Sequence, residues 1–234
     1  MTDRMLLRLS ATLLFIGQLV AFVLDFLHPS SGGAGTNQTT FAAYAGSSDY
    51  AAIHLGQFAS TAVLLAGLLV LFFALGVSQG APRWLGVFGA IAAGVTMALE
   101  GVQMAVDGVA LKQAVDAWVS APAAEQATRF ASAQAIRWLE TGAASYWNFM
   151  QGLALVLFAL VIVWTARVTR PIGSLMGVSG LAFIGAGWVF GTEGFMVTSG
   201  GLLQAAGYTF LFALTIWLLI VAWRRKESVQ AAPA

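Results

Sequence analysis

Residues 51–77 read AAIHLGQFASTAVLLAGLLVLFFALGV and contain no aspartate, glutamate, lysine or arginine. A helix of roughly 20 apolar residues crosses a bilayer core about 30 Å thick, so this stretch is long enough to span a membrane. Five further stretches have the same character. The six expected spans are about 6–28, 51–77, 84–110, 143–166, 173–195 and 201–223. The pattern predicts an all-α polytopic membrane protein whose six transmembrane helices form a single domain over residues 1–234.

The composition supports the same class. Hydrophobic residues make up 59% of the 234 residues and charged residues only 9%, with a mean hydropathy of +0.82. A soluble domain of this length has too little interior for so much apolar surface. The net charge of +1 argues against nucleic acid as a partner, which leaves the lipid bilayer and, in one interpretation, other membrane subunits. The absence of cysteine excludes disulfides and thiolate metal ligands.

The distribution of basic residues predicts the orientation. Eight of the eleven lysines and arginines lie on the side of the two termini, and Lys112, Arg129 and Arg137 lie on the other side. Because basic residues accumulate on the cytoplasmic side, we expect a multi-pass protein of the cell membrane with both termini in the cytoplasm.

Two loops have different characters. Residues 29–50 are rich in glycine, serine and threonine and are interpreted as an ordinary exterior loop. Residues 111–142 contain good helix formers with apolar residues among polar ones, which predicts that the third and fourth spans continue outside the membrane as helices. The expected product is a protruding, extracytoplasmic hairpin broken near Ser120–Pro122.

Two carboxylates in apolar stretches point to a functional site. Leu99-Glu100-Gly101 ends the third span and Thr192-Glu193-Gly194 ends the fifth. An ionised side chain at the centre of a transmembrane helix costs about 2.5–3.5 kcal/mol on insertion scales, so such residues usually have a function. Asp25 is expected at a similar depth near the outer end of the first span. The chain's only histidines, His28 and His54, are expected at the same level.

An internal repeat would bring these residues together. Gln57 precedes Glu100 by about the same interval as Gln151 precedes Glu193, and His54 and Asn148 each stand three residues before the glutamine. We therefore hypothesise that spans 51–77 with 84–110, and 143–166 with 173–195, are two copies of one helical hairpin. Spans 201–223 and 6–28 would be a third copy.

The expected site is an outward-facing layer of carboxylates, amides and imidazoles. Within span 84–110, Glu100, Gln103 and Asp107 share a helix face through their i, i+3, i+7 spacing. The expected ligand-binding residues are Asp25, His54, Gln57, Glu100, Gln103, Asp107, Asn148, Gln151 and Glu193. Trp147 is expected to be an interfacial anchor instead.

Several functions fit such a layer. The favoured interpretation is a site for a cation or a polar small molecule, because carboxylates packed together in a low dielectric must be partly protonated or neutralised. A metal-dependent membrane enzyme is an alternative, in which zinc, iron or manganese would be held by ligands chosen from His28, His54, Asp25, Glu100 and Glu193. Two further interpretations remain open. The protein is a non-catalytic subunit of a larger membrane complex, or its carboxylates serve only to fix the packing of the helices. Haem between His28 and His54 is less favoured because both lie at helix ends beside polar loops.

A short motif suggests a resemblance. Pro82-Arg83-Trp84-Leu85-Gly86, followed by Leu99-Glu100-Gly101, is similar to inner loops and helix-embedded glutamates in a large group of uncharacterised bacterial six-helix integral membrane proteins. The resemblance covers the hydropathy plan of most of the chain and implies a bacterial inner-membrane protein. It assigns no activity and no catalytic residue.

Overall fold

The structure, a computed structural model, describes residues 3–29 and 36–224. Across these residues the chain is helical and has no strand. The elements are α1 (Arg4–Leu27), α2 (Asn37–Gly46), α3 (Tyr50–Leu75), α4 (Gly80–Ala105), the π-helix η1 (Val106–Leu111), α5 (Lys112–Val119), α6 (Ala123–Thr165), α7 (Arg170–Glu193) and α8 (Thr198–Arg224). Six helical segments are long and apolar enough to cross a membrane. The predicted all-α, six-helix membrane fold is therefore confirmed.

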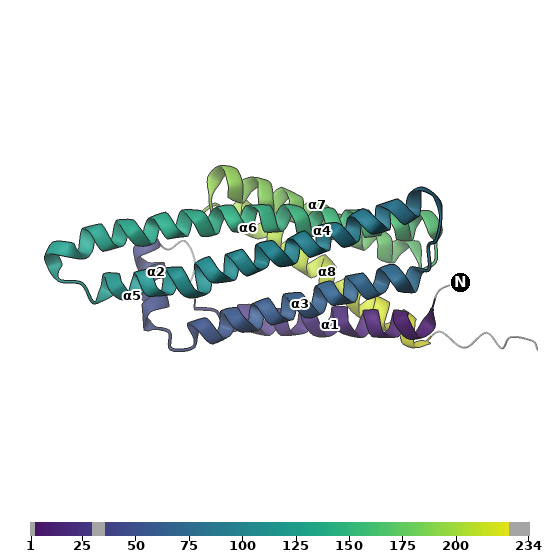
Figure 1. The fold of residues 1–234 in the computed structure, drawn as a ribbon, viewed down its shortest axis with the longest axis horizontal. Coiled ribbons are helices and arrows are strands. Elements are labelled where there is room, and N and C mark those ends of the chain that lie inside the picture. Colours follow the sequence, from purple (N-terminus) through teal and green to yellow (C-terminus); the bar gives the residue numbers. More distant parts are fainter. Residues whose placement is uncertain (1–2, 30–35, 225–234) are drawn as a thin grey trace, which may run out of the picture.

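The third and fourth spans extend far beyond bilayer thickness, as predicted. α4, η1 and α5 follow one another without a break over residues 80–119, and α6 contains 43 residues. At 1.5 Å per residue, α6 is about 65 Å long, roughly twice the thickness of a bilayer core. The two rods are joined at residues 120–122, where the break was expected. In Figure 1 the α5–α6 turn lies at the end of the molecule opposite the N-terminus.

The expectation of an ordinary loop over residues 29–50 is wrong for its second half, where α2 forms. Thr36 caps this helix by accepting a hydrogen bond from the backbone N–H of Thr39. Phe41 and Tyr44 are buried against a cluster formed with Tyr50, Leu111, Val115 and Ala133. Burial of these two aromatic side chains stabilises a helix that is too short to be stable alone. α2 therefore covers the base of the extended hairpin.

The half of the bundle nearer the termini is closely packed with apolar side chains. α1 packs mainly on α3, α4 packs on α6, and α7 packs between α6 and α8. Buried leucines such as Leu14, Leu68 and Leu71 fill the half nearer the termini. A Cβ atom on Gly152 would lie 2.4 Å from the carbonyl oxygen of Gly180, so the absence of a side chain allows α6 and α7 to approach this closely.

The packing does not support the repeat hypothesis. α6 and α7 pack along each other, whereas α3 and α4 make much less contact and pack mainly on α1 and α6. The two proposed hairpin copies therefore have different surroundings. The orientation remains a prediction, and Arg225 and Lys226, two of the residues on which it depends, lie outside the described residues.

Candidate functional site

Three ligand-type side chains converge at the end of the bundle opposite the termini. Nε2 of His28 lies 3.3 Å from Nε2 of His54. Nε2 of His54 lies 2.9 Å from Oδ2 of Asp107. Taken one per residue, the three potential ligand atoms all lie within 4.8 Å of one another. His54 and Asp107 are buried, with exposed fractions of 2% and 6%. Two histidines and a carboxylate therefore meet in one protected place.

Tyr50 orients two of these three residues. Its carbonyl oxygen lies 2.7 Å from Nδ1 of His54. A carbonyl oxygen only accepts hydrogen bonds, so Nδ1 of His54 carries the proton and donates it. In its neutral form, the His54 ring therefore presents a lone pair on Nε2, the atom that faces Oδ2 of Asp107. The Tyr50 hydroxyl donates to Oδ1 of Asp107, which leaves Oδ2 directed at His54.

Local sequence explains how the three residues reach this place. His28 ends α1 with an extended backbone, because Pro29 disfavours helical geometry in the residue before it. Asp107 lies in η1, and π-helical turns often occur at functional sites. Gly108 allows η1 to approach α3, since a Cβ atom on it would lie 2.6 Å from Cβ of His54.

Aromatic and charged residues surround the site. The His28 ring packs against the rings of Tyr44 and Tyr50, with centroids 5.6 and 5.7 Å apart. Burial lowers the pKa of His28 to about 4, so this ring is neutral at pH 7. Burial also raises the pKa of Tyr44 above its ordinary value, which keeps its hydroxyl protonated. Nη1 of Arg137 donates to Tyr44 Oη at 3.5 Å and to both oxygens of Glu140 at 2.6 and 2.7 Å.

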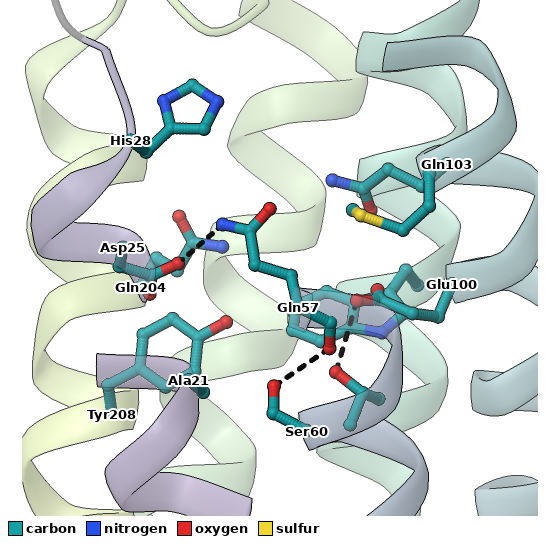
Figure 2. A pocket seen from close by; sticks show the side chains of 12 residues that line it. Ala21, Asp25, His28, Gln57, Ser60, Glu100, Gln103, Gln204 and Tyr208 are labelled. Carbon is teal, nitrogen blue, oxygen red and sulfur yellow. Dashed lines mark hydrogen bonds between the residues drawn. The ribbon is translucent and has the colours of Figure 1, made fainter. Parts of the chain in front are cut away.

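A polar cavity of about 290 Å³ lies beside this cluster, and His28 borders both. It contains two carboxylates. The Gln57 amide donates to Oδ1 of Asp25 at 2.8 Å, and the Thr61 hydroxyl donates to Oε1 of Glu100 at 3.1 Å. In Figure 2, Gln57 lies between Asp25 and Glu100. The lining residues are Ala21, Asp25, His28, Gln57, Ser60, Thr61, Glu100, Gln103, Met104, Trp147, Gln204 and Tyr208.

The structure brings together only part of the predicted site. Asp107 was predicted to be a ligand-binding residue but not a metal ligand. In the structure it is the carboxylate beside the two histidines, a position that was predicted for Asp25, Glu100 or Glu193. The cavity instead collects Asp25, Gln57, Glu100 and Gln103.

Three other expected site residues lie elsewhere. Asn148 and Gln151 are buried in α6 but do not line the cavity, and the Asn148 amide donates to the carbonyl oxygen of Ala144. Glu193 is exposed at the end of α7 and is also absent from the lining. The prediction that Glu100 and Glu193 share a cavity is therefore wrong, because α7 ends away from it.

Several residues of the site were not predicted from the sequence. Tyr50 lies four residues before His54, a spacing that puts both on one helix face. This spacing was a signal that could have been used. Trp147 was expected at a lipid interface, but it is only 6% exposed and lines the cavity. The Arg137–Glu140 pair also carried a signal in its i, i+3 spacing.

Comparison with known proteins gives no further identification. No family model, curated protein or solved structure matches the chain.

Proposed function

We propose that this membrane protein binds one divalent first-row transition metal ion through His28, His54 and Asp107. The observation that carries the proposal is the convergence of three ligand atoms with the His54 tautomer already set for binding. An Nδ1–H held by a carbonyl oxygen, with Nε2 directed at the ion, is the usual arrangement of a metal-binding histidine.

The distances support this proposal. Two ligands that each lie about 2.1 Å from an ion, at angles of 90–109°, are about 3.0–3.4 Å apart. The His28–His54 separation of 3.3 Å lies within this range, the His54–Asp107 separation of 2.9 Å lies just below it, and His28 and Asp107 offer ligand atoms within 4.8 Å of each other. Two imidazoles and one carboxylate suit zinc or iron(II). The 3.3 Å separation leaves no room for a porphyrin between the two rings, so the geometry gives no support to haem.

Without a metal ion, the same arrangement is electrostatically costly. Nε2 of a neutral His54 would direct its lone pair at both Oδ2 of Asp107 and Nε2 of His28. Either a proton or a metal ion must relieve this repulsion. A proton on Nε2 of His54 provides one donor for two acceptors, Oδ2 of Asp107 and Nε2 of His28. A metal ion instead accepts a lone pair from each of the three atoms.

Metal analysis of the purified protein tests the proposal. Protein in detergent is stripped with a chelator, reloaded with Zn²⁺ or, anaerobically, with Fe²⁺, and desalted. We expect about one ion per chain, and loss of that ion in His54→Ala and Asp107→Asn. Asp116→Asn is the matched control, because this carboxylate pairs with Lys112 on an exposed surface. Retained stoichiometry in folded Asp107→Asn, or no binding by the wild type, would overturn the proposal.

A second candidate function is metal-dependent catalysis. It is favoured by one observation: three protein ligands leave a coordination position free, and His28 lies on the boundary between the cluster and the cavity. A catalytic metal site needs such an open position next to a space for substrate.

We further propose that the termini face the cytoplasm, which would place the metal centre on the outer side of the membrane. The support is the eight-to-three distribution of basic residues. The extended hairpin would then project away from the cytoplasm.

A further inference from the structure

The cavity beside the metal cluster has unmatched polar groups. Nε1 of Trp147 is buried and has no hydrogen-bond partner in the described part of the chain, and the same holds for Oε1 of Gln57 and of Gln103. All three residues line the cavity. A buried polar atom without a partner costs about 1–3 kcal/mol, so these groups point to a ligand that supplies one acceptor and several donors.

The charge of the cavity defines the ligand further. Asp25 and Glu100 line it, and none of its lining residues is a lysine or arginine. Two carboxylates in a low-dielectric space favour a bound cation and disfavour an anion. An ammonium group has three N–H donors, which match carboxylate and glutamine oxygens. A neighbouring hydroxyl or carbonyl oxygen would accept from Trp147.

A second, mostly apolar groove adjoins the cavity. This second space, of about 450 Å³, lies between α1 and α8 and is lined by Gln18, Phe22, Asp25, Phe26, Ala205, Tyr208, Thr209 and Phe212. Asp25 and Tyr208 line both spaces, so they mark the junction. α8 makes less contact with α1 than with α7, which leaves this side of the bundle open. The groove therefore lies between the polar, acidic cavity and the exposed side of α1 and α8, where Phe22 and Phe26 are exposed.

We propose that the cavity and groove together bind a single-chain amphiphile with a primary ammonium group and an adjacent hydroxyl or carbonyl oxygen. The head would lie between Asp25 and Glu100, and the alkyl chain would lie along Phe22 and Phe212. Such a molecule can enter from the lipid phase because the groove faces it. This inference extends the proposed function by naming a ligand class, but it does not require the metal ion to be bound.

Binding of three related probes tests this proposal on the full-length protein. The first probe, 1-amino-2-dodecanol, has the required head and chain. The second, 1,2-dodecanediol, keeps the chain without the charge, and the third, 1-amino-2-propanol, keeps the head without the chain. Dissociation constants are measured by titration with native mass spectrometry, on both metal-free and zinc-loaded protein. We expect the first probe to bind at least tenfold more tightly than either of the others.

Variants separate the two halves of the site. Asp25→Asn and Glu100→Gln should each weaken 1-amino-2-dodecanol at least tenfold, whereas Glu193→Gln, an exposed carboxylate outside the cavity, should not change it. Ala205→Phe should fill the groove and remove the advantage of the long chain, while 1-amino-2-propanol still binds. Asp25 lies at the edge of the cavity, so its variant should fold even if the buried Glu100 variant does not.

Equal binding of the amine and the diol would overturn the proposal, as would unchanged binding in Asp25→Asn. The two proposals fail separately, because metal content is measured on the same samples. A protein that holds one zinc ion but shows no preference for the amine would retain the metal proposal and exclude this one. A protein that binds the amine but no metal would exclude the metal proposal and retain this one.

Discussion

Replacing Tyr50 by phenylalanine should weaken metal binding without disturbing the fold. Tyr50 is fully buried, and phenylalanine keeps its ring and volume. The backbone carbonyl that fixes His54 is also kept. Only the hydroxyl that donates to Oδ1 of Asp107 is lost. The substitution therefore separates the orientation of Asp107 from the orientation of His54.

The magnitude follows from the kind of bond that is removed. Loss of an outer partner of a metal ligand typically lowers affinity 10–100-fold. That range corresponds to about 1.4–2.7 kcal/mol, which agrees with the ~1.5–3 kcal/mol of a hydrogen bond to a charged group. We expect the zinc dissociation constant of Tyr50→Phe to rise within this range, as measured by competition with a chromogenic chelator.

A double-mutant cycle makes the test specific. Asp107→Asn is expected to lose the ion on desalting but to keep a weak affinity that chelator competition can measure; if the Tyr50 hydroxyl acts through Asp107, Tyr50→Phe should lower this remaining affinity little further. Tyr146→Phe is the control, because this tyrosine is 66% exposed. Unchanged affinity in Tyr50→Phe, or fully additive losses in the double variant, would refute the reasoning.

Three further outcomes are expected. Gly108→Ala should abolish metal binding, because its Cβ atom would displace η1 from His54. Gly142 has open space around it, so Gly142→Ala should bind metal normally. Equal metal affinities of the two variants would contradict the close approach of η1 to α3. Breaking the buried Arg137–Glu140 pair with Arg137→Met should destabilise the protein by about 3–5 kcal/mol in a denaturant titration. Arg129→Met breaks an exposed pair on the same helix and should cost about 1 kcal/mol or less, so similar losses would count against burial as the cause. Reporter fusions at residues 80 and 125 should lie on opposite sides of the membrane, and a cytoplasmic residue 125 would overturn the orientation.

The pH dependence of metal-free stability gives another expected outcome. Burial lowers the pKa of His28 to about 4, from an ordinary value of 6.5. The unfolded state therefore binds more protons between these two values, and stability should fall as pH decreases from about 6.5 to 4. Asp107 opposes this lowering, while His54 and Arg137 reinforce it. His28→Gln should flatten the pH profile in that window, and an unchanged slope would show that His28 is not the group responsible.

Hydropathy was sufficient to predict the fold, whereas the site required knowledge of packing. Each expected span coincides with a helix, because in lipid only a helix satisfies the backbone of a long apolar segment. The helix-forming composition of residues 111–142 likewise predicted the hairpin extension. α2 was missed because its glycine- and serine-rich surroundings obscured two aromatic residues that are buried only by tertiary contact.

The site was predicted in part for a similar reason. Both histidines were placed at the correct level, because depth along a helix can be counted from its end. Helical spacing also predicted that Glu100, Gln103 and Asp107 share a face, and the first two do line one cavity. Asp107 lies seven residues, about 10 Å, further along the helix than Glu100, within η1, and contacts His54 instead. A π-helical turn has no signal in this sequence that we could identify.

α6 acts as a lever. It runs for 43 residues without a break, and Trp147 on the cavity wall is only ten residues, about 15 Å, from Arg137 beneath α2. No break in the helix separates the hairpin from the cavity wall. A displacement of the hairpin is therefore expected to reach Trp147 on the cavity wall.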